Sequence, residues 1–346
     1  MVKFRKFLCC FITLALLIAF TACGKKRSSV SWFDIFDTVT IMLGYTNTPE
    51  KFSEQSAFVK EELTRYHKLY DIYHTYPNMN NLKTINDNAG IQPVKVDQEI
   101  IDLILLGKEL FELTDGQTNI AMGSVLSLWH AAREKAEQNP DQAALPDQTA
   151  LQEAALHMDI NQVIVDQENS TVFLQDPLMR LDVGSLGKGY AVEQVAQKAQ
   201  AKGVSSALLS IGGNLRAIGK KPDGLWSGGI QNPWNPQESS PYIVQLQNNH
   251  ALVTSGDYQR FYEVEGKQYH HIIDPDTQMP ASYVNSVSVL SNDSGLADGL
   301  STALFNMPVE QGMALIESLE STEAIWMLPD KSVKMSSGFS QFLKKN

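Results

Sequence analysis

The sequence predicts an α+β protein with antiparallel-rich sheets and flanking helices. Strand patterns crowd together between residues 242 and 290 and helical patterns follow, which is typical of α+β proteins and not of doubly wound folds. The chain has 346 residues, of which 43% are apolar, so it can bury a large core. Its net charge is −11 and no basic face is visible, which argues against nucleic acid as a partner.

Residues 1–22 predict a lipoprotein signal peptide. Basic residues precede an apolar run at 7–20, which is too short for a comfortable membrane span, and Phe20-Thr21-Ala22-Cys23 resembles a lipoprotein signal box. We therefore expect a lipid on Cys23 and an extracytoplasmic protein anchored to the bacterial cell membrane. An uncleaved anchor and an ordinary signal peptide are the alternatives.

Residues 23–30 predict a short flexible tether. Its basic residues Lys25-Lys26-Arg27 would lie on the anionic membrane surface, and Ser28-Ser29 follow them. Cleavage before Cys23 also removes the other two cysteines, so we expect neither a disulfide nor a thiol nucleophile in the mature protein. Residues 31–346 would then form the folded domain.

In the first half of this domain, near-alternating apolar residues at 31–45 predict a strand or hairpin that is broken at Phe36-Asp37-Thr38. Apolar residues at helical spacing predict a packed helix at 49–73, and Asp97 predicts the cap of a second one. The other expected elements are a surface loop at 78–93, a helix end at 114–116, a helix containing Val125 and Trp129, a polar connection at 134–149 and a short helix at 150–157.

In the second half, short apolar runs bounded by turn residues predict most of the strands. The expected strands are 163–165, 171–174, a short strand ending at Asp182, 207–211, 242–246, 251–254, 261–264, 269–273, 286–290 and 324–328. The expected helices are 185–202, 294–305 and 309–319, and the segment 224–241 is expected to be a loop.

The segment 181–190, Leu-Asp-Val-Gly-Ser-Leu-Gly-Lys-Gly-Tyr, predicts a phosphate site. Glycines let the backbone approach a phosphate, helix N-terminal amides point toward it, and Lys188 supplies charge, while Asp182 could hold a metal. The alternative is a strand–turn–helix junction whose glycines serve only the turn. Neither the Walker motif nor the dinucleotide-binding glycine motif matches the segment.

Asp298 and Thr302 lie four residues apart on a predicted helix, so both side chains leave the same face. Two oxygen donors placed in this way suit Mg²⁺, whereas the alternative is a solvated face with an intrahelical hydrogen bond. His271 and Asp274 could be a general base and its orienting group, or a structural histidine followed by a turn-starting Asp-Pro. The remaining histidines lack metal-ligand spacing, so zinc is not expected.

Six motifs together resemble the ApbE family of FAD:protein FMN transferases, which are often bacterial lipoproteins. They span about 35–305, nearly all of the mature domain. The motifs are Phe36-Asp37-Thr38, the stretch from Thr114-Asp115-Gly116 to Trp129, the segment 181–190, Ser210-Ile211-Gly212-Gly213-Asn214-Leu215, the stretch from Thr254-Ser255-Gly256-Asp257-Tyr258 to His271-Ile272-Ile273-Asp274-Pro275, and Ala297-Asp298-Gly299-Leu300-Ser301-Thr302-Ala303-Leu304.

The resemblance implies an α+β fold with FAD in a central cleft, and Mg²⁺-dependent transfer of FMN from FAD to a Ser or Thr hydroxyl of an acceptor protein. The product would be a phosphoester, and AMP would be released. The acceptor would be a subunit of a membrane redox complex or an extracytoplasmic flavoprotein. An FAD pyrophosphatase of the same fold and a non-catalytic FAD-binding lipoprotein are the alternatives.

The resemblance also assigns residues. The metal positions are Asp182, Ser185, Asp298 and Thr302, and the catalytic positions are His271, Asp182 and Lys188. The positions around FAD are Phe36, Ile120, Ala121, Met122, Asp182, Lys188 and Ile272. Family members usually have Met-Gly at the Phe36-Asp37 position, and some have an acidic residue where Ser301 stands. The latter difference predicts a single Mg²⁺ ion instead of two.

Overall fold

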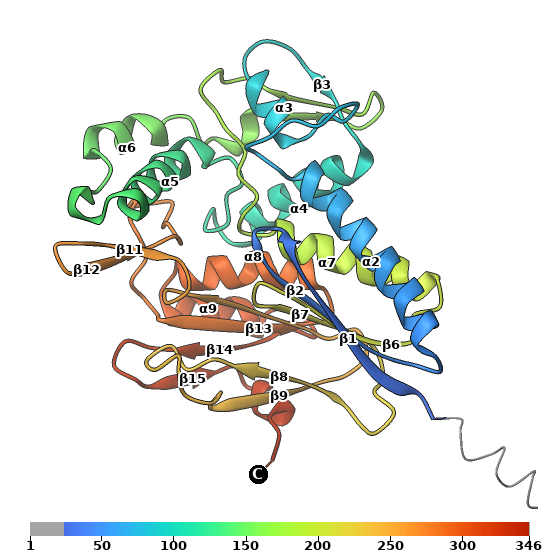
Figure 1. The fold of residues 1–346 in the computed structure, drawn as a ribbon. Helices are drawn as coiled ribbons and strands as arrows, with labels where there is room; N and C mark the ends of the chain where they lie inside the picture. The colour runs from blue at the N-terminus through green and yellow to red at the C-terminus, as the bar shows by residue number, and fades with distance from the viewer. Residues whose placement is uncertain (1–23, 346) are drawn as a thin grey trace, which may run out of the picture.

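The computed structural model describes residues 24–345, and its centre is an eight-stranded antiparallel sheet with the order β1-β2-β6-β7-β10-β13-β14-β15. Helices α2, α7 and α8 lie on one side of this sheet, and the small β8–β9 sheet lies on the other side (Figure 1). The prediction of an α+β fold with antiparallel-rich sheets and flanking helices is therefore confirmed. The predicted signal peptide and Cys23 lie outside the described residues.

The elements of regular structure have the following bounds. The strands are β1 (Lys26–Ile35), β2 (Thr38–Thr46), β3 (Val94–Lys95), β4 (Val163–Asp166), β5 (Thr171–Leu174), β6 (Ser206–Ile211), β7 (Asn214–Gly219), β8 (Trp226–Ile230), β9 (Tyr242–Leu246), β10 (Ala251–Gly256), β11 (Phe261–Val264), β12 (Lys267–His270), β13 (Ser286–Ser291), β14 (Glu323–Met327) and β15 (Val333–Met335). The α-helices are α2 (Pro49–Leu69), α3 (Leu82–Asp87), α4 (Gln98–Leu113), α5 (Gly123–Gln138), α6 (Gln148–Ala155), α7 (Gly187–Ala201), α8 (Ser294–Phe305) and α9 (Val309–Glu317).

The first hairpin forms where the alternating pattern predicted it, but it begins earlier than expected. β1 starts at Lys26, whose register partner on β2 is Thr46, so most of the predicted tether at 23–30 belongs to the sheet. The turn between the strands consists of Phe36 and Asp37, with φ values of 54° and 49°. Left-handed conformations at both central positions match the twist of a tight hairpin, although glycine or asparagine is the usual residue there.

Several predicted boundaries were wrong for local reasons. The expected loop at 78–93 contains α3, because Asn81 and Thr84 form a reciprocal capping box. The expected loop at 224–241 contains β8, in which two glycines weakened the strand pattern. The short strand expected to end at Asp182 does not form; between β5 and Asp182 only an isolated bridge joins Arg180 to Met122. The polar connection at 134–149 starts later than expected because α5 continues to Gln138.

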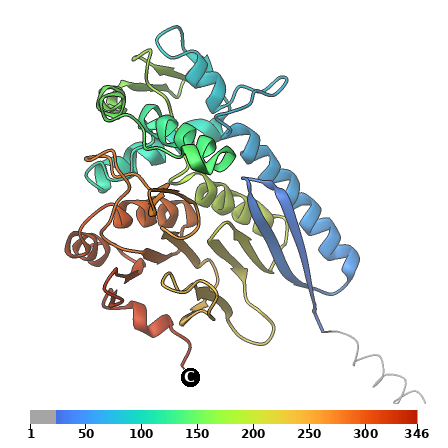
Figure 2. The ribbon, with the colours of Figure 1, turned by 60° about the vertical axis from the view of Figure 1, so that its left-hand side comes forward.

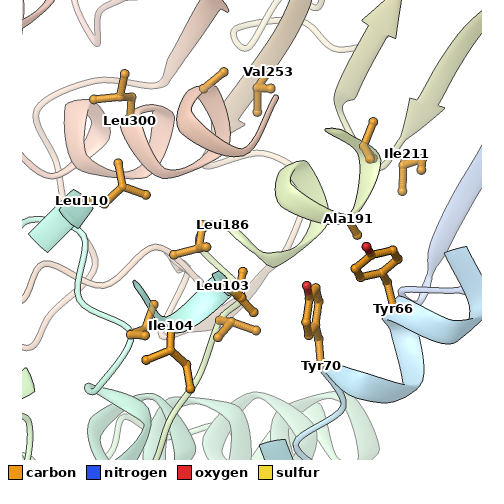
Figure 3. Close-up of a cluster of buried hydrophobic side chains, with 14 of the residues drawn as sticks. Tyr66, Tyr70, Leu103, Ile104, Leu110, Leu186, Ala191, Ile211, Val253 and Leu300 are labelled. Carbon is orange, nitrogen blue, oxygen red and sulfur yellow. The ribbon is translucent and has the colours of Figure 1, made fainter. Parts of the chain in front are cut away.

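The main core lies between the helices and one face of the central sheet. Figure 3 shows its centre, where side chains from α2, α4, α7 and α8 meet those of β6 and β10. A second cluster fills the space between the opposite face and β8–β9, and a third joins α5 and α6 to the β11–β12 hairpin. The hairpin and α5 therefore pack together at one end of the main sheet (Figure 2).

A buried ion pair holds α7, α8 and β7 together. Glu193 on α7 accepts hydrogen bonds from Nε and Nη2 of Arg216 at 2.6 and 2.7 Å, and from the backbone N–H of Ser294 at 2.9 Å. Burial alone would raise the pKa of Glu193, but the hydrogen bonds and charge of Arg216 hold this pKa below its ordinary value. The pair fixes the N-terminus of α8 against the middle of α7.

We expect Arg216→Ala to destabilise the fold by about 3–5 kcal/mol, because it leaves the Glu193 carboxylate buried without its counter-ion. Denaturant titration of the purified domain measures this effect. The matched control is Lys334→Ala, which removes an exposed ion pair with Glu310 and should change stability very little. Replacing Glu193 and Arg216 together by methionine should restore most of the loss. A small loss of stability in Arg216→Ala would contradict the conclusion that the ion pair stabilises the contact among α7, α8 and β7.

Candidate active site

The segment 182–189 contacts one turn of α8 at two of its residues. Oδ2 of Asp298 accepts a hydrogen bond from the backbone N–H of Gly189 at 2.7 Å, and Oγ1 of Thr302 donates to the Ser185 carbonyl at 3.3 Å. Within the segment, Oδ1 of Asp182 accepts from the N–H of Gly184 at 2.8 Å. The structure therefore brings the four predicted metal residues onto one loop and one helical turn that contact each other.

Gly189 permits this contact between α7 and α8. A Cβ atom at this position would lie 2.2 Å from the carbonyl oxygen of Ser294 and 2.4 Å from Cβ of Asp298. The N–H of Gly187 is also occupied, because it donates to the Val183 carbonyl at 2.7 Å. The glycines thus serve helix packing and ligand orientation, and the N-terminus of α7 offers fewer free amides to a phosphate than the glycine pattern suggested.

The Asp298 carboxylate has little contact with water, since the residue is only 5% exposed. Burial raises the pKa of Asp298, while the positive charge of Lys188 and the Gly189 N–H oppose this effect. The alternative of a solvated helix face is therefore wrong, although an intrahelical hydrogen bond from Oγ1 of Thr302 to the Asp298 carbonyl is present at 3.5 Å. A carboxylate in this environment is stabilised by a cation, and the nearby Oγ of Ser185 is buried without a hydrogen-bond partner.

These donors fit a hard cation that prefers oxygen ligands. Two carboxylates and two hydroxyl groups are the donor type that Mg²⁺ prefers, with waters or phosphate oxygens in its remaining positions. Over residues 24–345 there is no group of three or more His, Cys, Asp or Glu side chains that could hold a metal ion. Hydroxyl oxygens and the substrate would therefore have to complete the coordination.

The residues predicted to line FAD are divided between the surface of this site and the core. Nζ of Lys188 lies on the site and donates to the Gly184 carbonyl at 3.1 Å. Ile120 and Ala121 are fully buried in the main core, and the Ile120 carbonyl accepts from the N–H of Asp182 at 2.9 Å. Met122 and Ile272 are also buried. Contacts of Ile120 and Ala121 with a ligand would have to come from their backbone.

Phe36 lies in the hairpin turn between β1 and β2 and contacts α2. Its ring packs edge-on against His67 with centroids 5.5 Å apart, and its N–H donates to Nδ1 of His67 at 3.2 Å. The neighbouring Asp37 carbonyl accepts from Nη2 of Arg260 at 3.3 Å. The turn therefore connects α2 to the segment that carries the predicted catalytic histidine.

His271 lies at the end of β12 and faces Arg260. Its backbone N–H donates to the Arg260 carbonyl, and its Nδ1 lies 3.2 Å from the same oxygen. A carbonyl can only accept, so Nδ1 carries the proton and Nε2 keeps its lone pair. Asp274 is not the orienting group, because its Oδ1 accepts from the N–H groups of Asp276 and Thr277. The alternative of a turn-starting aspartate is therefore the correct one.

The environment of His271 favours the neutral imidazole. Burial lowers its pKa to about 3, with further contributions from the positive charges of Arg260 and Lys188. The unprotonated ring is thus the form present at neutral pH. A neutral imidazole with a free Nε2 can accept a proton from a hydroxyl group.

Two polar residues near this site, Tyr73 and His130, were missed by the sequence analysis. The hydroxyl of Tyr73 lies 3.1 Å from Nδ1 of His130 on α5. Burial and the charge of Asp182 raise the pKa of Tyr73 to about 12, and burial lowers that of His130, an effect that Asp182 opposes. His130 and His271 line the same narrow cleft between α5 and the β11–β12 hairpin. The only feature of the sequence that could have pointed to these two residues is the position of His130 directly after the Thr114–Trp129 motif.

Comparison with known proteins agrees with this geometry. The profile of the ApbE family matches residues 37–326. The FAD:protein FMN transferase of Treponema pallidum is 35% identical over 272 residues, which cover 74% of this chain and 73% of the relative. The one from Vibrio cholerae is 29% identical over 339 residues, covering 96% and 98% of the two chains.

Solved structures show the same fold. The crystal structure of the ApbE protein from Thermotoga maritima superposes with a TM-score of 0.81 at 26% identity, covering 92% of this chain and all of that one. Fold, site and relatives together define the class of this protein, which is a transferase. The chain belongs to the ApbE family.

Proposed function

We propose that the protein transfers FMN from FAD to a Ser or Thr hydroxyl of an acceptor flavoprotein, with Mg²⁺ as cofactor. The observation that carries this proposal is that the charge of Lys188 acts both on His271, a neutral histidine with a free Nε2, and on the buried carboxylate of Asp298. The names of the relatives, FAD:protein FMN transferases, support the choice of substrate.

In the proposed reaction, the acceptor oxygen attacks the phosphorus of the FMN half of FAD, and the bond to the bridging diphosphate oxygen breaks. The acceptor proton passes to Nε2 of His271, and the bridging oxygen leaves as part of AMP. Lys188 offsets the negative charge of the diphosphate, since positioning and charge neutralisation dominate such transfers. Mg²⁺, held by Asp182, Ser185, Asp298 and Thr302, would supply further charge neutralisation.

An assay of the products tests the proposal. The mature protein is incubated with FAD and Mg²⁺, with and without an acceptor domain, while AMP, free FMN and protein-bound flavin are followed. Acceptor-dependent AMP release with covalent flavin on the acceptor is the expected result. AMP with only free FMN would identify an FAD pyrophosphatase, and FAD binding without products would identify a non-catalytic flavin-binding protein.

We expect Lys188→Ala to weaken FAD binding by roughly tenfold, and riboflavin binding much less, because the lost ammonium acts on the diphosphate. Fluorescence titration with both ligands measures the difference. The matched control is Lys202→Ala at the other end of α7, where the ammonium lies over the Phe58 ring. Equal losses for both ligands would place Lys188 outside the diphosphate site.

We also propose that Cys23 carries a lipid and that the domain is extracytoplasmic and attached to the cell membrane. The signal box before Cys23 supports this. None of the helices in the part of the chain that the structure describes is long and apolar enough to cross a membrane.

Removing residues 1–22, or Cys23→Ser, should release a folded and active domain, because the described core begins beyond this segment. Metabolic labelling with a fatty acid and fractionation of membranes measure the effect. Lipid labelling that persists in the Cys23→Ser protein would contradict the assignment.

A further inference from the structure

A second cavity lies on the face of the central sheet that points away from α7 and α8. Leu215 and Leu252, which line it, belong to the core cluster shared with β8 and β9, whereas Arg216 points to the other face and pairs with Glu193 on α7. The cavity has a volume of about 170 Å³. This is far more than the ~10–15 Å³ that a single buried water requires.

The chemistry of this cavity does not suit a diphosphate or a metal ion. None of its lining side chains is charged, and the polar ones are hydroxyls and amides, among them Ser210, Thr254, Gln231 and Gln259. The hydroxyl of Tyr258, another lining residue, is buried without a hydrogen-bond partner. Uncharged donors and acceptors of this kind match the amide groups of a peptide backbone.

The backbone beside the cavity can also bind a peptide. Gly229, at the end of β8, forms part of the wall. β8 pairs with β9, and no other described strand pairs with it, so its second edge presents N–H and C=O groups that an added strand could use.

The cavity is connected to the candidate active site through one short segment. Gln259 lines the cavity, and the next residue, Arg260, contacts both His271 and Asp37. An attacking hydroxyl must approach the phosphorus from the side opposite to the leaving oxygen. The acceptor oxygen and the AMP half of FAD therefore lie on opposite sides of the reacting phosphorus. The predicted metal residues lie on α8 and the segment before α7, on the other face of the sheet from the cavity.

We propose that this cavity receives an extended segment of the acceptor protein, the segment that carries the reacting Ser or Thr. The inference rests on the proposed function. The segment pairs with the edge of β8, its amide groups bind the hydroxyls and amides of the lining, and its reacting hydroxyl passes Gln259 to reach Nε2 of His271.

Two variants that fill the cavity from opposite walls test the proposal: Gln231→Trp and Ser210→Phe. The matched control, Gln245→Trp, changes the partner strand β9 outside the cavity lining. We expect kcat/KM for an acceptor domain to fall by about tenfold in each cavity variant, mainly through KM, which corresponds to ~1.4 kcal/mol. The FAD affinity of both cavity variants should equal that of the wild type. The Gln245→Trp control should keep the wild-type kcat/KM for the acceptor domain.

Wild-type kcat/KM in both folded cavity variants would overturn the proposal. An equal loss of FAD affinity would also overturn it, because the cavity would then belong to the nucleotide site. If the wild-type protein transfers no FMN, the proposed function fails, and hydrogen exchange tests docking separately. An acceptor domain whose reacting hydroxyl is replaced by alanine should still protect the backbone amides of β8, and lack of protection would overturn the docking inference.

Discussion

Asp298→Asn should bring Mg²⁺-dependent FMN transfer close to background, which is the largest effect we expect from a single substitution. The amide keeps an oxygen that can accept the Gly189 N–H, but it removes the negative charge that would hold the cation. Because burial raises the pKa of Asp298, the neutral side chain should not lower the melting temperature. Calorimetric Mg²⁺ titration and single-turnover assays measure binding and rate separately.

The matched control for this variant is Asp293→Asn on the same helix. Asp293 caps α8 by accepting the Leu296 N–H, and burial raises its pKa as well, but it is not one of the predicted metal residues. Asparagine is an equally good helix cap, so this variant should retain Mg²⁺ affinity and activity. Normal Mg²⁺-dependent turnover in Asp298→Asn, or the same defect in both variants, would contradict the metal assignment.

His271→Ala should bind FAD and Mg²⁺ almost normally and transfer FMN about 10²–10⁴ times more slowly, as expected for the loss of a general base. The neutral ring persists down to low pH, because the pKa of His271 is lowered to about 3. The acid limb that this histidine imposes on kcat/KM should therefore lie far below the ordinary histidine pKa of about 6.5. A bound diphosphate should raise the pKa, since a nearby anion stabilises the imidazolium.

His270→Ala provides the comparison for this variant. His270 lies with Nε2 2.8 Å from the Ala281 carbonyl and accepts the Ile272 N–H, so it is a structural residue. Its loss should lower stability and leave the transfer rate of the folded protein nearly unchanged. A titration of the ring protons by NMR gives the pKa of His271 directly. Wild-type single-turnover rates in His271→Ala would assign the base to another group.

The parts of the fold that the sequence predicted well have strong local patterns. α2, α4 and α8 carry long apolar stripes, and β10 and β13 are short apolar runs between turn residues, so local periodicity was sufficient. β7, β8 and β15 were missed because they are short or contain glycines, which makes their local pattern weak. Pairing with neighbouring strands, and not the local sequence, decides that these segments are strands. The early start of β1 has the same cause, since only pairing with β2 shows that the basic segment is a strand.

The candidate site was predictable where its residues are close in sequence. The spacing of Asp298 and Thr302 placed both on one helical face, and 181–190 was identified as the segment beside them through the family resemblance. The approach of His130 to Tyr73 depends on how α5 packs, and the contact of Gly189 with α8 depends on two helices far apart in the chain. The sequence left open whether Asp274 orients His271, because closeness in sequence does not decide which group is nearest in space; the structure places the Arg260 carbonyl beside His271 instead.

The start of β1 at Lys26 limits where an anchored protein can work. With a lipid on Cys23, only two residues separate the attachment point from an ordered strand, which allows a reach of roughly 10 Å. β1 itself, with 10 residues, adds about 33 Å up to the hairpin turn that carries Phe36. This turn can therefore stand no more than about 45 Å above the lipid headgroups. If Cys23 carries the lipid, an acceptor would have to present its hydroxyl within that height, which would favour proteins held close to the same bilayer over those that diffuse freely.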